Sequence, residues 1–168
     1  MSEGPLHPSL WFRRVLGHFP TGVVIVTAVH DGRPAGMAIG SFTSVSVDPP
    51  LIAVLPAKTS TSWPSIEAAG SFCVNILSAR QEALSRAFAV SGADKFAGVS
   101  WRAGPSGAPV LAGALAWIDC DLEQVVEAGD HFIDLGRVTA LDVGDPDGED
   151  PVRAPLVFFQ GGYGTVNG

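Results

Sequence analysis

The sequence contains few charged residues, and its cations are outnumbered. Only 16% of the 168 residues are charged, and 10 lysines and arginines stand against 17 acidic residues, which leaves a formal net charge of −7. A surface of this sign repels a phosphodiester backbone, and the chain has no basic cluster large enough to offset that repulsion. We therefore expect no nucleic-acid partner.

Long apolar runs are also missing. The opening sequence MSEGPLHPSL has neither the basic region nor the apolar region of a signal peptide. No apolar run reaches the length that a bilayer-spanning helix needs. The expected location is therefore cytoplasmic, with no membrane partner.

Cysteine and histidine are too few and too scattered for a metal centre. Cys73 and Cys120 lie far apart in strand-like segments, a placement typical of two buried thiols. The four histidines show no ligand spacing. The acidic segment 142–150 has its glycine too early for a calcium loop, so we interpret it as a solvated loop. No metal is expected.

The common catalytic motifs are absent as well. The chain has no Gly-x-Ser-x-Gly elbow, no Walker A loop and no Gly-x-Gly-x-x-Gly after a strand. Because little remains for side-chain catalysis, the sequence favours a bound cofactor that carries the chemistry.

The residues that are present favour a mainly β protein. Hydrophobic residues make up 46% of the chain, and 20 glycines with 13 prolines indicate many turns between short strands. The length suits a single domain over residues 1–168, with residues 1–8 and 165–168 as flexible ends. Strands are predicted at 23–29, 35–47, 51–55, 72–77, 116–123, 131–143 and 155–160.

Three short helices are predicted between these strands. The first covers 9–19 and carries one apolar stripe, which consists of Trp11, Phe12, Val15, Leu16 and Phe19. The second ends at Gly70. The third opens at Ser78, where Gln81 completes a capping box. Along the strand that begins at 116, apolar residues alternate with Trp117, Asp119, Asp121 and Glu123, which predicts a polar second face.

The turn after the strand at 51–55 is rich in hydroxyls. Lys58, Thr59, Ser60, Thr61 and Ser62 precede a helix whose first amides have no partner within the helix. Such amides and a nearby lysine favour an anion such as a terminal phosphate. Ordinary helix capping with a solvated lysine explains the same residues, and the turn alone leaves both interpretations open.

The segment 41–46 has hydroxyls on both faces of its predicted strand, at Ser41, Thr43, Ser44 and Ser46. A flat ring with polar edges could use these hydroxyls and the neighbouring backbone amides. A partly exposed edge strand is the alternative.

Seven stretches form a pattern in chain order. They are FRRVLGHFPTGV at 12–23, SFTSVSVDPPL at 41–51, FCVNIL at 72–77, LSRAFA at 84–89, DKF at 94–96, GDH at 129–131 and GRV at 136–138. Together they resemble the flavin reductase-like domain family, which includes the reductase components of two-component flavin-dependent monooxygenases. The resemblance extends over about residues 11–165.

The resemblance implies a split β-barrel of Greek-key type with short flanking helices. It also implies a homodimer, bound FMN, and NADH as hydride donor. By position, the residues that it assigns to the flavin ring and its approach are Pro20, Thr21, Gly22, Ser41, Phe42, Thr43 and Ser44. To the flavin phosphate it assigns Lys58, Thr59, Ser60, Thr61 and Ser62. To a loop over the flavin tail it assigns Phe88, Lys95 and Phe96. His131 corresponds to the histidine near the nicotinamide, and Tyr163 to the family's C-terminal tyrosine.

The chain departs from the family pattern just before Tyr163. One or two basic residues are usual there, whereas this chain has Gln160-Gly161-Gly162. The departure gives no reason to expect NADPH, whose extra phosphate is normally held by arginine or lysine.

The expected activity is NADH-dependent reduction of FMN, or of FAD, with release of the reduced flavin to a separate monooxygenase. A non-catalytic flavin-binding protein on the same barrel is the main alternative. A plain ligand-binding barrel is a further one, although its cavity would be lined by apolar groups rather than hydroxyls.

Overall fold

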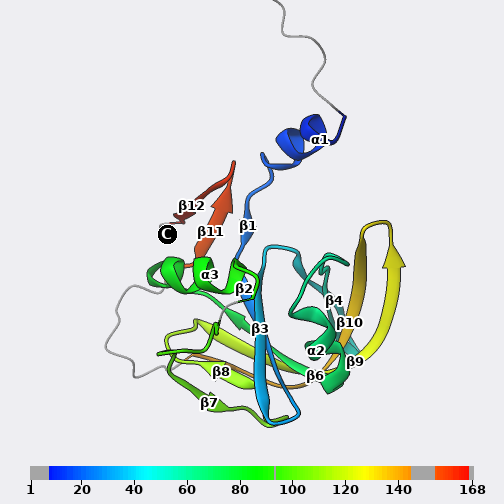
Figure 1. Ribbon diagram of the computed structural model, residues 1–168, viewed down its shortest axis with the longest axis vertical. Helices are drawn as coiled ribbons and strands as arrows, with labels where there is room; N and C mark the ends of the chain where they lie inside the picture. Colours follow the sequence, from blue (N-terminus) through cyan, green and yellow to red (C-terminus); the bar gives the residue numbers. More distant parts are fainter. Residues whose placement is uncertain (1–7, 93, 145–153, 167–168) are drawn as a thin grey trace, which may run out of the picture.

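A seven-stranded antiparallel sheet forms the body of the structure, a computed structural model that describes residues 8–92, 94–144 and 154–166. Its strands, in chain order, are β2 (Val24–His30), β3 (Arg33–Ile39), β4 (Phe42–Val47), β5 (Pro50–Val54), β6 (Ser71–Ile76), β9 (Ala116–Ala128) and β10 (His131–Val143). Across the sheet the order is β3-β2-β6-β9-β10-β5-β4 (Figure 1).

The two edge strands of this sheet, β3 and β4, follow one another in the chain. Only Gly40 and Ser41 separate them, so the edges meet at one end and the sheet rolls into a split barrel. The prediction of one continuous strand over 35–47 is therefore wrong. At the break, Gly40 lies so close to Thr21 that a Cβ on it would sit 2.8 Å from the Thr21 hydroxyl oxygen, a distance that excludes larger residues.

Strand β2 is buried on both of its faces. Val24 and Val26 point into the barrel, while Val23 and Ile25 pack against a second cluster outside it. This follows from the alternation of side chains along a strand and explains why residues 23–26 are all apolar. The predicted Asp-Gly turn after β2 is confirmed, with Asp31 and Gly32 both at positive φ.

Helix α2 (Trp63–Ala69) closes one opening of the barrel. Its Trp63 and Ile66 are buried in the barrel cluster, and the Trp63 ring meets that of Phe72 edge to face at 6.2 Å between centroids. The predicted end at Gly70 is confirmed, and this glycine has the left-handed conformation with φ of 72°.

The second cluster packs between the barrel and a small outer layer. That layer contains a three-residue 3-10 helix (Ala79–Gln81), α3 (Glu82–Ala89) and a three-stranded sheet of β1 (Thr21–Gly22), β11 (Leu156–Phe159) and β12 (Gly162–Thr165). The predicted capping box of Ser78 and Gln81 is confirmed. Leu77 and Phe88 are fully buried in this cluster, as their spacing predicted.

A hairpin of β7 (Trp101–Ala103) and β8 (Pro109–Leu111) covers part of β9 and corrects the prediction of a polar face there. Asp119 was expected on that face, yet it is fully buried. Its carboxylate accepts hydrogen bonds from the amide and the hydroxyl of Ser106 at 2.7 Å and 2.6 Å. These bonds satisfy the buried charge and hold the hairpin to the sheet.

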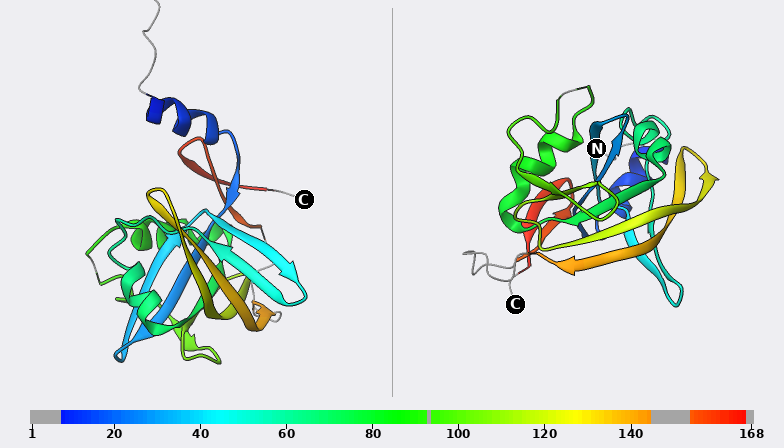
Figure 2. Two further views of the ribbon diagram at one scale, coloured as in Figure 1. Left: turned by 90° about the vertical axis from the view of Figure 1, so that its right-hand side faces the viewer. Right: turned by 90° about the horizontal axis from the view of Figure 1, so that it is seen from below.

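Helix α1 (Pro8–Leu16) stands apart from the barrel (Figure 1 and Figure 2, left). None of its residues is buried, and its apolar stripe faces outward, with Phe12 63% and Phe19 73% exposed. The predicted helix exists, but the described part of the chain does not cover its stripe.

Three further expectations concern the whole chain. Cys73 and Cys120 are free and buried, as predicted, and burial raises the pKa of each thiol to about 12. Of the ends expected to be flexible, Pro8 begins α1 and Thr165 ends β12, while residues 1–7 and 167–168 lie outside the described part. Residues 145–153, most of the predicted acidic loop, lie outside it too. None of the described helices is long and apolar enough to cross a bilayer.

Candidate functional site

The two hydroxyl-rich stretches lie side by side because β5 joins them. Strand β4 pairs with β5 from Phe42 opposite Val54 to Val47 opposite Pro50. The Ser41 hydroxyl donates to the Leu55 carbonyl at 3.0 Å and accepts from the Leu55 amide at 3.3 Å. Leu55 in turn leads directly into the turn at 56–62. The tertiary structure therefore brings the start of β4 next to the predicted phosphate turn.

The turn borders a groove of about 570 Å³, which we call the Lys95 groove. Its lining residues come from β3, from the start of α2 and from the loop after α3: Arg33, Pro34, Ala35, Gly36, Thr61, Ser62, Ser65, Gly92, Asp94, Lys95 and Phe96. Four of them are residues that the family resemblance assigned to the flavin. The groove thus unites Thr61 and Ser62 with Lys95 and Phe96, which are distant in the sequence.

Lys95 is the centre of this groove. Its ammonium group donates to the Ser62 hydroxyl at 2.9 Å, to the Phe88 carbonyl at 3.0 Å and to the Gly36 carbonyl at 3.1 Å. Partial burial lowers its pKa. All three donors of the ammonium are engaged, so Lys95 offers a ligand its charge while the three bonds hold the groove together.

Ser60 caps helix α2. Its hydroxyl oxygen accepts from the amides of Ser62 at 3.3 Å and of Trp63 at 3.1 Å, and it lies 3.5 Å from the Met37 sulfur. The sequence left capping and anion binding open for this turn. Capping is what Ser60 does, and the two amides that it engages are therefore occupied.

Lys58 points away from the Lys95 groove, toward the β9–β10 hairpin. Its ammonium pairs with Glu127 at 2.9 Å and lies 5.4 Å from the centre of the Phe132 ring. The hydrogen bond and charge of Lys58 lower the pKa of Glu127. The five residues predicted to bind the phosphate therefore do not share one site. Lys58 points toward the β9–β10 hairpin, whereas Thr61 and Ser62 line the Lys95 groove.

His131 lies beside this turn at the start of β10. A bridge pairs it with Ala57, and the Lys58 amide donates to the Asp130 carbonyl at 2.9 Å. The His131 Nδ1 is 2.7 Å from an Asp130 carboxylate oxygen. This hydrogen bond, with the charge of the imidazole, lowers the pKa of Asp130. The half-exposed ring is thereby oriented by a neighbouring carboxylate.

The other residues that the resemblance assigned to the flavin ring lie on β1 and β4 or just before them. Thr21 and Gly22 form β1, which pairs with β11, and Pro20 is exposed just before it. Thr43 and Ser44 are exposed on β4, with Phe42 half-buried before them. The Ser41 hydroxyl is occupied by Leu55, so it fixes the start of β4.

Phe88 and Tyr163 occupy other places. The Phe88 ring is fully buried and packs edge to face on Phe96 at 5.0 Å, so Phe88 reaches the groove through its carbonyl. The Tyr163 hydroxyl lies 2.9 Å from the Ser85 hydroxyl, and its ring packs under the Arg86 guanidinium at 4.7 Å. Tyr163 is thus a half-buried contact between β12 and α3.

Sequence reasoning gave no site role to three polar residues of the groove, Arg33, Ser65 and the acidic Asp94. Arg33 was interpreted only as part of the Asp-Gly turn, and Ser65 as an ordinary helix residue. An arginine directly after a tight turn was the available signal, because arginine suits phosphate recognition. Gly36 was missed too, and a Cβ there would lie 2.7 Å from the Phe88 ring.

Comparison with known proteins identifies the family. The model of the flavin reductase like domain matches residues 16–167. The chain belongs to the flavin reductase-like domain family. The prediction made from its seven sequence stretches is confirmed, and so is the mainly β split-barrel fold.

Three relatives illustrate the likeness. A flavin reductase of Pseudomonas putida is 53% identical over 155 residues, which cover 92% of this chain and 88% of the relative. The reductase subunit HsaB of a flavin-dependent monooxygenase from Rhodococcus jostii is 46% identical, covering 90% and 75%. The structure of an NADH:FAD oxidoreductase from Streptomyces globisporus, in complex with NAD and FAD fragments, has a TM-score of 0.85 and 37% identity, covering 95% and 93%.

Proposed function

We propose that the protein transfers a hydride from NADH to FMN and releases the reduced flavin to a separate monooxygenase component. The observation that carries this proposal is the Lys95 groove, in which two cationic and three hydroxyl side chains outnumber one carboxylate, that of Asp94. Family membership supports a flavin as the guest, and the relatives' names support a monooxygenase as the consumer.

The chemistry of the Lys95 groove fits a flavin phosphate. Lys95 and Arg33 supply positive charge to an otherwise acidic chain. Ser62 accepts its hydrogen bond from Lys95, so its own proton is left to donate to an anion. Thr61 and Ser65 add two more hydroxyls at the same wall. We assign these five residues to the phosphate.

Thr43, Ser44 and the β4 backbone are the groups proposed to face the flavin ring. When bound, flavin supplies the hydride-accepting ring. Hydroxyls and amides along its edge would stabilise negative charge that grows during reduction, a role that requires fixed positions. Ser41 provides this fixity through its two bonds to Leu55.

His131 is proposed to orient the nicotinamide. Asp130 holds the ring by Nδ1, which leaves Nε2 for the donor. Holding the donor carbon over the acceptor is a proximity effect, and it contributes to the rate without any proton transfer by His131.

A homodimer is proposed because several apolar surfaces have no cover within the described part of the chain. The α1 stripe, Val47 of β4 at 93% exposure and Phe159 of β11 at 45% are all open. Isolated apolar side chains are normal on a surface, but an entire exposed apolar helix face marks an interaction site. A second copy would bury these surfaces and complete the walls of the site.

Anaerobic stopped-flow mixing of the purified protein with NADH, in the presence of FMN or FAD, tests the proposed activity. The expected result is rapid bleaching of flavin absorbance with multiple turnovers when flavin is in excess. Flavin binding without NADH oxidation would overturn the proposal and favour the non-catalytic flavin-binding protein. A lower KM for FAD than for FMN would correct the choice of flavin.

Variants of the groove test the assignment of the phosphate. Ser62→Ala removes the free hydroxyl proton, and we expect the KM for FMN to rise about tenfold, in line with the loss of one charge-assisted hydrogen bond. Riboflavin, which lacks the phosphate, serves as the control substrate. Its KM should change little in the same variant. An equal rise for both flavins would contradict the assignment.

A further inference from the structure

Helix α1 and the turn between β11 and β12 enclose a second basic pocket, of about 360 Å³. It is lined by Arg13, Arg14, Gly17, His18, Gln160 and Gly161, and we call it the α1 pocket. The Gln160 amide donates to the Gly17 carbonyl at 3.0 Å, which ties the turn to the end of the helix. Two of the ten basic residues of an acidic chain therefore meet in one small hollow.

Neither guanidinium group in this pocket forms an ion pair within the described part of the chain. Both side chains are exposed, and no described carboxylate forms an ion pair with either of them. Arg14 lies over the Trp11 ring at 5.7 Å from its centre, a contact that leaves its N–H groups available. Exposed arginines that form no ion pair favour an anion from outside, and arginine matches phosphate oxygens in a bidentate manner.

The turn between β9 and β10, which leads into His131, lies at the end of the barrel from which α1 projects (Figure 1 and Figure 2, left). The pKa of Asp130, which orients His131, is lowered mainly by that histidine and in small part by the charge of Arg13. The hollow is therefore on the side of the molecule where the nicotinamide was assigned. The Lys95 groove, which was assigned to the flavin phosphate, has a separate lining.

From these observations we propose that Arg13 and Arg14 bind the pyrophosphate of the NADH donor. This deepens the proposed function and rests on it. Helix α1 then supplies the positive charge that the segment Gln160–Gly162 lacks, and the β11–β12 turn shapes the hollow that receives the phosphates.

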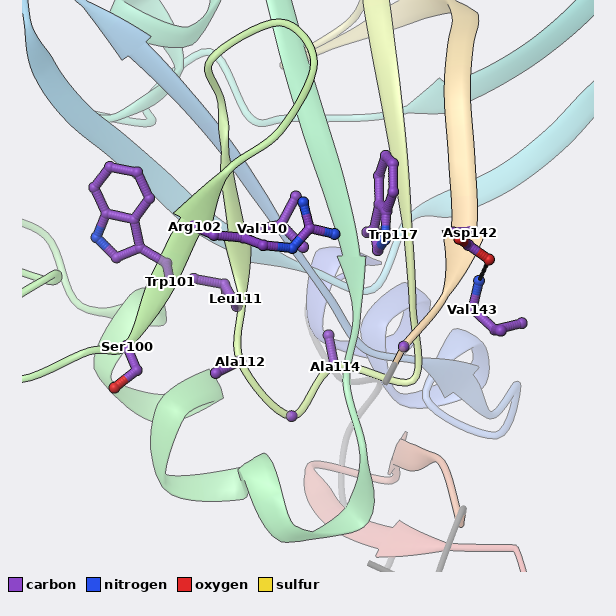
Figure 3. Close-up of a pocket in the computed structure, with 12 residues that line it drawn as sticks. Ser100, Trp101, Arg102, Val110, Leu111, Ala112, Ala114, Trp117, Asp142 and Val143 are labelled. Atoms are coloured by element: carbon purple, nitrogen blue, oxygen red, sulfur yellow. Dashed lines mark hydrogen bonds between the residues drawn. The ribbon is translucent and has the colours of Figure 1, made fainter. Parts of the chain in front are cut away.

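Arg102, which lines a different pocket of the same molecule, offers a matched control. Figure 3 shows Arg102 of β7 extended toward Trp117, with its guanidinium 5.2 Å from the centre of that ring. Its pocket of about 530 Å³ also includes Val143, at the opposite end of β10 from His131. Arg102→Gln thus removes an arginine that contacts an aromatic ring but lies away from the proposed donor site.

Kinetics with two hydride donors test the proposal. One donor is NADH, and the other is 1-benzyl-1,4-dihydronicotinamide, which carries no phosphate. For the double variant Arg13→Gln/Arg14→Gln we expect the KM for NADH to rise about tenfold with kcat within about twofold, because two charge-assisted contacts are lost. The constants for the benzyl donor should stay within about twofold of the parent, since this donor has no anion to hold. Arg13→Lys/Arg14→Lys should recover most of the NADH affinity, and Arg102→Gln should behave as the parent.

Binding of ADP-ribose gives a readout that does not depend on turnover. This probe contains the pyrophosphate and no nicotinamide, and calorimetry should show about tenfold weaker binding to the double Gln variant. An unchanged KM for NADH with unchanged ADP-ribose binding would overturn the proposal. An equal loss with both donors would also overturn it, because the arginines would then act through structure. If the parent oxidises neither donor, the proposed function itself fails, and ADP-ribose binding still decides the role of the arginines.

Discussion

Strand β2 and helix α1 are both rich in apolar residues, yet the chain buries one and exposes the other. Val24, Ile25 and Val26 are at most 3% exposed, whereas Trp11 and Phe12 are 54% and 63% exposed. The sequence pattern specifies the type of each element but not the surface that covers it. In β2 the cover comes from the barrel and from the outer layer. For α1 it has to come from outside the described chain.

The largest expected difference between the two regions concerns stability. Phe72→Ala empties a fully buried position that packs on Trp63, so we expect a loss of about 3–5 kcal/mol in the free energy of unfolding. Phe12→Ala, on α1, should change it by no more than about 0.5 kcal/mol in the monomer. Urea unfolding at high dilution measures both. Similar losses for the two variants would show that α1 is packed within the monomer.

A carboxyl group in the barrel interior makes the stability of this region depend on pH. Asp134 is fully buried, neither carboxylate oxygen has a partner among the described residues, and burial raises its pKa to about 7. In the unfolded chain this carboxyl ionises near pH 4, so stability should fall as the pH rises from about 4 to 7 and then stay level.

Asp134→Asn removes this ionisation. We expect the variant to be about 2–4 kcal/mol more stable than the parent at pH 8 and nearly equal at pH 4, by the linkage between proton binding and folding. Asp121→Asn, an exposed position on β9, serves as the control and should leave the pH dependence unchanged. A parent protein whose stability does not fall between pH 4 and pH 7 would contradict the prediction.

A smaller effect is expected at the edge of the barrel, where Ser60 caps α2. Ser60→Ala should cost about 1 kcal/mol because the amides of Ser62 and Trp63 lose their acceptor. Ser91→Ala, at an exposed position, should be neutral. Thermal unfolding of the two variants side by side measures the difference, and an unchanged Ser60→Ala midpoint would argue against the capping role.

Substitutions in α1 should have the smallest effect on the free energy of unfolding of the monomer. They should nevertheless have a clear effect on dimer formation. Trp11→Ser/Phe12→Ser should leave the free energy of unfolding at high dilution within about 0.5 kcal/mol of the parent. In the parent, the proposed dimer should make the melting temperature rise with protein concentration. The double variant should lose this dependence and sediment as a monomer. A variant that remains dimeric would remove α1 from the interface.

Patterns that depend on local geometry were predicted well. The Asp-Gly turn, the left-handed Gly70 and the capping box at Ser78 follow from backbone preferences and short-range hydrogen bonds. The long hairpin strand beginning at His131 was also predicted correctly. Each of these features is decided by residues within a few positions of one another.

Features that depend on distant partners were predicted less well. The strand break at Gly40 depends on the approach of Thr21, and the burial of Asp119 depends on Ser106. The short strands of β7 and β8 were missed because they are stabilised mainly by the sheet beneath them.

For the candidate site, the residue types and the family pattern pointed to segments of which four residues, Thr61, Ser62, Lys95 and Phe96, line one groove. The fold decided which of those residues line the Lys95 groove and which point elsewhere. Lys58 forms an ion pair with Glu127, whereas Lys95, in the loop after α3, donates a hydrogen bond to Ser62. Arg33 of β3 lines the same groove as Lys95 and Ser62, although the sequence predicted no role for it.

The amino-acid sequence by itself determined the family, the mainly β architecture and the local turns, because these depend on residue type, alternation and short spacing. Only the tertiary structure decided which charges meet, which hydroxyls are already occupied and which apolar faces remain open. These outcomes depend on contacts between segments far apart in the chain, whose geometry follows from how the sheet rolls and where its edges meet.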